Sequence, residues 1–202
     1  MGVVNVTPDS FSDGGAFDDA TQAIDHGRRL AAEGAAILDV GGESTRPGAD
    51  PVGVEEELRR VVGVVAGLST FARVSIDTMK LSVAEAAVDA GATYVNDVTS
   101  FRHDPELAGF VADRGLDCCL MHMLGEPRTM QADPRYVDVV SEVKAFLTER
   151  MEAAVRAGVP EERIQLDPGI GFGKTIEHNL ELLRRLHELT DLGRPLVIGT
   201  SR

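Results

Sequence analysis

Short apolar runs that alternate with amphipathic segments are the feature that most constrains how this chain can fold. The runs cover residues 2–6, 36–40, 73–76, 94–98, 117–121, 164–166 and 195–198. Strict alternation of strands with helices is typical of a parallel sheet, closed as a (β/α)₈ barrel or open and doubly wound. The sequence therefore predicts an α/β fold with seven strands.

Polar side chains end six of these seven runs. They are Asn5, Asp39, Asp77, Asn96 with Asp97, His122 and Asp167. One aspartate in such a place commonly caps a helix or satisfies a loop, but six repetitions are hard to explain by capping. Functional sites lie at the carboxyl ends of the strands in both folds. We favour the TIM (β/α)₈ barrel, with seven of its eight strands in this chain.

The segments between the runs carry helix signals. Helices are predicted over residues 19–33, 83–90, 135–157 and 177–189. Ser82 with Glu85 predicts a capping box, and Asp104-Pro105 predicts an N-cap followed by a proline in the first turn. Gly158-Val159-Pro160 predicts a break.

Length and composition indicate one domain over residues 1–202. Hydrophobic residues make up 43% of the 202 residues, and no apolar stretch has the length of a membrane span. Because no eighth strand follows residues 195–198, we expect the barrel to be incomplete at the C-terminus. The absence of a signal-peptide pattern predicts a cytoplasmic protein.

Charge and cysteine content exclude several partners. A net charge of −13 argues against nucleic acid or an anionic membrane as a partner. Cys118 and Cys119 are adjacent in an apolar run, which indicates buried thiols rather than a disulfide or zinc site.

The stretch IQLDPGIGFGKT at residues 164–175 first suggests a phosphate-binding loop. A P-loop, GxxxxGK[ST], needs a glycine five residues before Gly173, where this chain has Pro168. The P-loop interpretation fails, and Asp167 becomes the residue to explain.

Two further loops follow strand ends. NVTPDSFSDGG spans residues 5–15 and GGESTRPG spans residues 41–48. Their hydroxyl and carboxyl side chains could simply satisfy turn backbone. Thr45 and Arg46, held before Pro47, could equally bind an anion, because the forked guanidinium suits phosphate.

These loops belong to a set of motifs that resembles the dihydropteroate synthase family. The others are SIDT (75–78), YVNDV (94–98), LMHMLGEPRTMQ (120–131), LDPGIGFGKT (166–175) and GTSR (199–202). The resemblance implies a TIM barrel. It also implies a transferase of folate biosynthesis that joins 7,8-dihydropterin-CH₂ diphosphate to p-aminobenzoate, releases pyrophosphate and is inhibited by sulfonamides.

The same resemblance implies the site residues. Asp77, Asn96 and Asp167 would bind the pterin. Met121, Ile170 and Phe172 would be its apolar walls, although ordinary packing explains them equally well. Thr45 would bind the diphosphate, Arg46 would lie near the aminobenzoate and the leaving group, and Asn5 would be a Mg²⁺ ligand. Catalysis would then depend on Asp77, Asp167 and Arg46.

Other features of the motifs stay outside this assignment. His122 lacks a second histidine at ligand spacing, so we expect a structural role. Lys174 is expected near the site as a bystander, since the family's principal lysine would follow Arg202. Two alternatives remain, a cobalamin-dependent pterin methyltransferase and a non-catalytic pterin-binding paralogue. Family members are commonly dimers, so a homodimer is possible.

Overall fold

The computed structural model describes residues 1–7, 16–45 and 48–200. Its contacts divide the chain into two compact units. The first unit comprises residues 1–44 and 50–96, and the second comprises residues 45–49 and 97–202.

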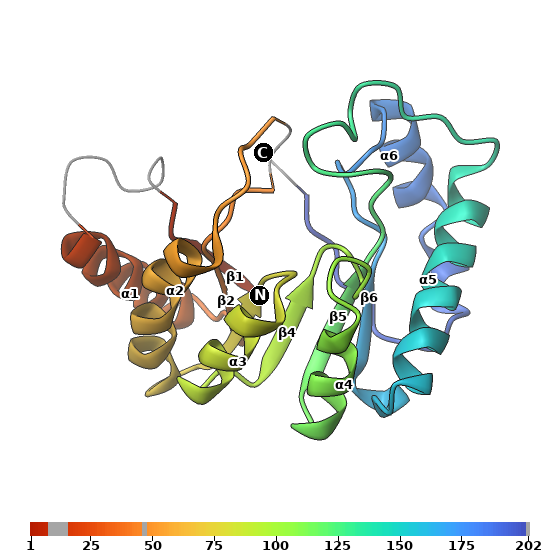
Figure 1. The fold of residues 1–202 in the computed structure, drawn as a ribbon. Helices are drawn as coiled ribbons and strands as arrows, with labels where there is room; N and C mark the ends of the chain where they lie inside the picture. The colour runs from red at the N-terminus through yellow and green to blue at the C-terminus, as the bar shows by residue number, and fades with distance from the viewer. Residues whose placement is uncertain (8–15, 46–47, 201–202) are drawn as a thin grey trace. The chain divides into compact units, whose positions relative to one another are not determined.

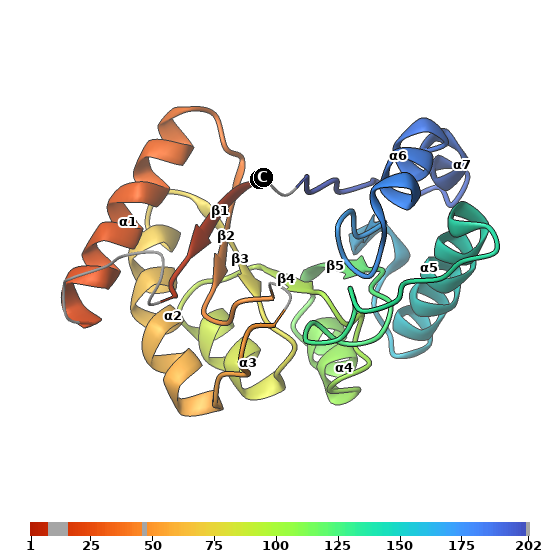
Figure 2. The same cartoon turned by 90° about the horizontal axis from the view of Figure 1, so that it is seen from above.

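The first unit is a parallel sheet covered by helices. Its strands β1 (Gly2–Asn5), β2 (Ile37–Gly41), β3 (Arg73–Asp77) and β4 (Tyr94–Asp97) pair in chain order. Helices α1 (Ala16–Ala32), α2 (Val54–Ser69) and α3 (Leu81–Asp89) cover one face of this sheet (Figures 1 and 2). The core lies between them, where α2 buries Val61, Val64, Val65 and Leu68.

The second unit contains β5 (Asp117–Met121) and β6 (Ile164–Asp167), which pair in parallel from Cys118 opposite Ile164 to Met121 opposite Asp167. Its helices are α4 (Glu106–Asp113), α5 (Val139–Arg156), α6 (Ile176–Arg184) and α7 (His187–Thr190), with a 3₁₀ turn η1 at Glu161–Arg163. In Figure 2, α6 and α7 lie beside α5.

The first six predicted strands are confirmed, each within one residue at either end. The seventh run, 195–198, pairs with β6 only through a single parallel bridge between Leu166 and Leu196. Two backbone hydrogen bonds form there, from the Leu166 N–H to Pro195 and from the Val197 N–H to Leu166. Two hydrogen bonds form an isolated bridge and not a strand, so the prediction of a seventh strand was wrong for the described residues.

Helix ends account for the other differences from the prediction. The capping box at Ser82 is wrong, because α3 begins two residues before the predicted start and its N-cap, Lys80, forms no side-chain cap bond. The predicted cap at Asp104 is replaced by Pro105, also without a side-chain bond. A capping box does form at α6, where Thr175 and His178 bond each other's backbone N–H groups. The predicted helix over 177–189 is two helices, α6 and α7.

A buried ion network holds α2 and the loop after β2 to β3. The Lys80 ammonium donates to the carboxylates of Glu43 and Glu57, and also to the Val52 carbonyl oxygen at 2.7 Å. Glu57 is 1% exposed and also accepts from the Thr78 hydroxyl at 2.7 Å. Lys80 therefore fixes both ends of the segment from Glu43 to Val52, which carries Thr45.

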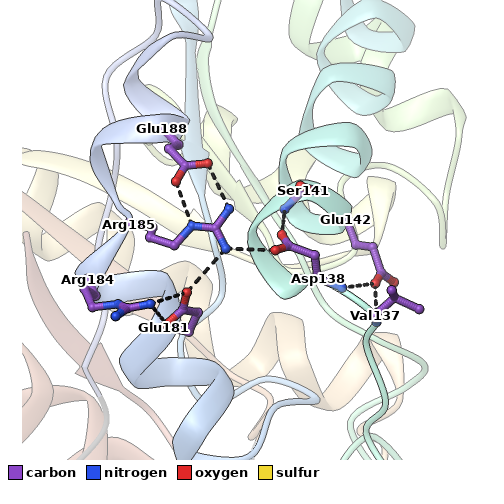
Figure 3. Close-up of polar contacts among 8 residues, drawn as sticks. All are labelled: Val137, Asp138, Ser141, Glu142, Glu181, Arg184, Arg185 and Glu188. Carbon is purple, nitrogen blue, oxygen red and sulfur yellow. Dashed lines mark hydrogen bonds and ion pairs between the residues drawn. The ribbon is translucent and has the colours of Figure 1, made fainter.

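A second network joins the start of α5 to the end of α6 (Figure 3). Arg185, which follows α6, donates to Asp138 at 2.8 Å and to Glu188 at 2.6 Å. Asp138 is also the N-cap of α5, accepting from the Ser141 N–H at 2.7 Å. The Arg185 guanidinium holds the pKa of Asp138 well below its usual range. The two helices are thus connected by a charge-assisted cap.

Lys80→Met tests the buried network. The variant leaves the buried Glu57 carboxylate without its cation, and we expect the free energy of unfolding to fall by about 3 kcal/mol. Arg28→Met is the control, because its ion pair with Asp25 is solvent-exposed and should be worth under about 1 kcal/mol. Urea denaturation of the whole chain measures both. Equal losses in the two variants would contradict a buried role for Lys80.

Candidate functional site

The register of the first unit aligns the predicted residues in one row. Asn5 pairs with Gly41, Gly41 with Asp77, and Asp77 with Asn96. These four positions lie at the carboxyl ends of β1 to β4. Neighbours in register on parallel strands direct their side chains to the same face of the sheet. Asn5, Asp77 and Asn96, predicted from separate motifs, are therefore brought together by strand pairing.

Gly41 keeps the middle of this row open. A Cβ atom at Gly41 would lie 3.4 Å from Oδ2 of Asp77 and 3.7 Å from Oδ1 of Asn5. The two side-chain oxygens thus border the space that any larger residue at position 41 would fill. The absence of a side chain there leaves room for a group that uses both oxygens.

Asp39 fixes the orientation of Asn96. The Asn96 amide nitrogen donates to Oδ2 of Asp39 at 2.9 Å, and Asp39 is 5% exposed. Burial raises the pKa of Asp39, and the hydrogen bond from Asn96 opposes that rise. Because one amide hydrogen is committed to Asp39, Asn96 retains its carbonyl oxygen and its second N–H for a ligand.

In the second unit, Asp167 ends β6 at the start of the glycine-rich turn of residues 168–173. Its Oδ1 accepts from the Gly169 N–H at 2.7 Å, and its backbone oxygen accepts from the His122 N–H at 2.9 Å. Burial raises the pKa of Asp167 to about 6, although the Gly169 bond and the charge of Lys174 both oppose the rise. Within residues 1–7, 16–45 and 48–200, its other carboxyl oxygen accepts no hydrogen bond, so this oxygen could accept one from a ligand.

Two of the three predicted apolar walls, Met121 and Phe172, belong to one cluster. Met121 is buried with Val98, Met123 and Met130, and the half-buried Phe172 packs against them. Ile170 is buried as well. The cluster joins the end of β5 to the glycine-rich turn, and the role of Met121 and Phe172 as walls of a pterin site stays a prediction.

Lys174 is the residue that the sequence interpretation undervalued. It is 1% exposed, and its ammonium lies 2.8 Å from His122 Nδ1 and 2.9 Å from the carbonyl oxygens of Gly169 and Phe172. Burial lowers the pKa of Lys174 to about 7, and the charge of Asp167 opposes that fall. Lys174 is thus a central contact of the turn and not a bystander near it.

His122 has the structural place that was expected of it. It is 5% exposed, and its ring meets that of Phe146 edge-on at 4.9 Å. Burial, helped by the charge of Lys174, lowers the pKa of His122 to about 3. A neutral ring can accept from Lys174 through Nδ1.

The loops carry the remaining predicted residues. Thr45 is half-buried, whereas Arg46 and residues 8–15 lie outside the described residues. Within residues 1–7, 16–45 and 48–200, no group of three His, Cys, Asp or Glu side chains could hold a metal ion. Over the same ranges, no helix is long and apolar enough to cross a membrane.

Sequence reasoning gave Asp39, Glu57 and Lys80 no role. A signal did exist for Glu57, which precedes Val61 by four residues and so continues the buried stripe of α2. For Asp39, the sequence pattern indicates only a position at the end of a strand. Lys80 had no local signal, because its acceptors Glu43 and Val52 are far away in the chain.

Known proteins resemble this chain along its whole length. It matches the family described as pterin binding enzyme over residues 1–202. It is 46% identical over 204 residues to the dihydropteroate synthase of Escherichia coli K12, covering 100% of this chain and 72% of that protein. Identity to the Mycobacterium leprae dihydropteroate synthase is 48% over 205 residues, with 100% and 72% covered.

Solved structures agree with these relatives. The Xanthomonas albilineans dihydropteroate synthase with 4-aminobenzoic acid has a TM-score of 0.92 at 50% identity, covering 100% of this chain and 72% of that one. The same enzyme in complex with 7,8-dihydropteroate has a TM-score of 0.87 at 46% identity, with 100% and 71% covered. The Yersinia pestis enzyme with a sulfonamide drug complex has a TM-score of 0.92 at 44% identity, with 100% and 74% covered.

The predicted fold class and family are therefore both confirmed. The parallel strands and their helices are those of a TIM-barrel enzyme, and the homologues are transferases. By its motifs, its sequence identity and its fold, this chain belongs to the dihydropteroate synthase family.

Proposed function

We propose that this chain joins 7,8-dihydropterin-CH₂ diphosphate to p-aminobenzoate, giving 7,8-dihydropteroate and pyrophosphate. The observation that carries the proposal is the row of Asn5, Gly41, Asp77 and Asn96 at the carboxyl ends of four parallel strands. Parallel α/β folds bind their ligands at these ends. The relatives whose structures hold aminobenzoate or dihydropteroate are 46–50% identical to this chain.

Pterin recognition would depend on Asp77, Asn96 and Asp167. The 2-aminopyrimidinone edge of a pterin presents adjacent N–H donors, and a carboxylate can accept two of them. Asn96, held by Asp39, would offer its carbonyl oxygen and its second N–H to the rest of the ring. As the family resemblance implies, the proposal treats residues 1–202 as one pterin-binding domain.

The chemistry would be a dissociative transfer. The C–O bond to the diphosphate breaks first and pyrophosphate leaves. The amine of aminobenzoate then attacks the resulting pterin-methylene cation, forming the C–N bond, and its nitrogen loses one proton to solvent. Asp77 and Asp167 would stabilise the developing cation, while Met121 and Phe172 would exclude water from it. Thr45 would bind the diphosphate, and Arg46 would lie close to the aminobenzoate and the leaving group.

Asn5 fits a magnesium ion that is shared with a substrate diphosphate. It is exposed at the end of β1, and its Oδ1 borders the open space at Gly41 together with the Asp77 carboxylate. Mg²⁺ binds few protein oxygens and completes its shell with phosphate and water. When bound, it would offset the negative charge that develops on the departing pyrophosphate. A homodimer is a part of the proposal that rests on the family resemblance, and a cytoplasmic location is a part that rests on the sequence pattern of the N-terminus.

Pyrophosphate release tests the reaction. We expect this chain to release pyrophosphate only when dihydropterin diphosphate, p-aminobenzoate and Mg²⁺ are all present, because the arylamine must trap the cation. A coupled pyrophosphate assay that omits each component in turn measures this. Release that does not depend on aminobenzoate, or methyl transfer from a methylated pterin, would overturn the assignment.

Asp167→Asn tests the pterin ligand. One acceptor oxygen becomes a donor, so we expect affinity for the dihydropterin diphosphate to fall about tenfold or more. Asp113→Asn, at the exposed end of α4, is the control. Isothermal titration calorimetry measures both variants.

The pH dependence follows from the pKa of Asp167. Since that pKa is raised to about 6, the carboxylate is charged above this pH and becomes protonated below it. Wild-type affinity should therefore fall as the pH drops through about 6, and the Asn variant should lack this acid limb. Equal affinities for Asp167→Asn and Asp113→Asn would refute the role of Asp167 as a pterin ligand. An acid limb that persists in Asp167→Asn would refute it as well.

A further inference from the structure

We propose that Lys174 is a positioning residue of the pterin site, whose buried ammonium ties the end of β5 to the glycine-rich turn and so holds Asp167 and Phe172 in place. The inference rests on the proposed function, because it assumes that these two residues contact the pterin. It gives a role to a lysine that the reaction itself does not use.

The ammonium has an acceptor for each of its three hydrogens. His122 Nδ1 lies at 2.8 Å, and the carbonyl oxygens of Gly169 and Phe172 both lie at 2.9 Å. The His122 carbonyl oxygen is a fourth neighbour at 3.4 Å. A protonated lysine has three donors and no acceptor. With its donors engaged and 1% of its surface exposed, Lys174 acts on a ligand through its neighbours.

Each acceptor is coupled to a proposed pterin contact. The Gly169 carbonyl oxygen accepts from Lys174, while the Gly169 N–H donates to Asp167 Oδ1 at 2.7 Å. The Phe172 carbonyl oxygen accepts from Lys174, and the Phe172 N–H closes back on Gly169 at 3.1 Å. The conformation that Lys174 fixes is therefore the one that orients the Asp167 carboxylate and presents the Phe172 ring.

The turn and the end of β5 approach each other closely. A Cβ atom at Gly169 would lie 1.9 Å from the His122 carbonyl oxygen, and Gly169 has a φ of +66°. The backbone of Lys174 is itself fixed, since its N–H donates to Gln131 Oε1 at 3.0 Å. The Tyr136 hydroxyl donates to the Gly173 carbonyl oxygen at 2.8 Å. Among the residues that the structure describes, only the Lys174 side chain forms hydrogen bonds both to the His122 side chain and to the carbonyl oxygens of the turn.

Charge adds to this geometry. The titratable groups around the turn are Asp167 on β6, His122 after β5, Tyr136 before α5 and His178 on α6, while Arg102 acts on His122. His122 is neutral, so Lys174 supplies the positive charge that favours the Asp167 carboxylate. Removing that charge should make Asp167 easier to protonate, and a neutral carboxyl is a poorer acceptor for the pterin donors.

Lys174→Met tests the proposal, with Lys144→Met as the matched control. Lys144 lies in the same unit and forms an exposed ion pair with Asp191 at 3.0 Å. Affinity for 7,8-dihydropterin-CH₂ diphosphate is measured by isothermal titration between about pH 5 and about pH 8. We expect Lys174→Met to lose about tenfold or more in affinity and to shift the acid limb upward by about one pH unit. Lys144→Met should match the wild type in both respects.

A pair of His122 variants keeps the proposal testable if Lys174→Met does not fold. Leu and Asn have nearly the same shape, but only Asn offers an acceptor for the ammonium. His122→Asn should retain the wild-type acid limb and most of the affinity, and His122→Leu should lose affinity. If both behave alike, the bond from Lys174 to position 122 does not position the site.

The outcomes separate this inference from the proposed function. If the wild type and Lys144→Met do not bind the dihydropterin diphosphate, the proposed function fails. If they bind, and Lys174→Met binds equally well with an unshifted acid limb, the positioning role alone is overturned.

Discussion

The arrangement of Asp167 and Phe172 in the second unit depends on the hydrogen bonds of the buried Lys174 ammonium. Burial of a lysine is costly unless its charge is hydrogen-bonded, and here three acceptors surround it. Two of those acceptors are carbonyl oxygens of the glycine-rich turn, and the third is the ring of His122. Satisfying the charge therefore requires the turn and the end of β5 to adopt one arrangement. This arrangement of the turn and the end of β5 sets the positions of Asp167 and Phe172.

Strand register plays the corresponding part in the first unit. Four parallel strands end with Asn5, Gly41, Asp77 and Asn96 in one row. A shift of one residue would turn the side chains of a strand to the other face, so the buried sides of β2 and β3 also specify the row. The Lys80 network then ties Glu43 and Val52, which lie in the loop after β2, to the end of β3 within the same unit. Each unit thus has a lysine with several acceptors that holds a loop following a strand.

The sequence was sufficient for the fold and for the residues at the strand ends. Apolar runs bounded by polar residues are local signals, and local signals locate strands such as β5 to the residue. It was insufficient for the residues that support those ends. Lys174 bonds His122 across 52 positions, and Asn96 bonds Asp39 across 57. No pattern within one segment predicts such partners, because these residues come into contact only once the strands have paired.

The capping box predicted at Ser82 failed for a related reason. A spacing of Ser and Glu matched a local rule, but α3 begins two residues before the predicted start, directly after a lysine that donates to Glu43 and Glu57. Tertiary bonds to a buried charge therefore outweighed a capping preference that is worth only about 1 kcal/mol.

The protonation state of His122 is the most direct test of the central claim that a charged Lys174 donates to this ring. Nitrogen NMR of histidine-labelled protein at pH 6, below the Lys174 pKa of about 7, reads which ring nitrogen carries hydrogen. The account predicts a neutral ring with its proton on Nε2 and with Nδ1 accepting, in line with a pKa of about 3. An imidazolium, or a neutral ring protonated on Nδ1, would contradict it.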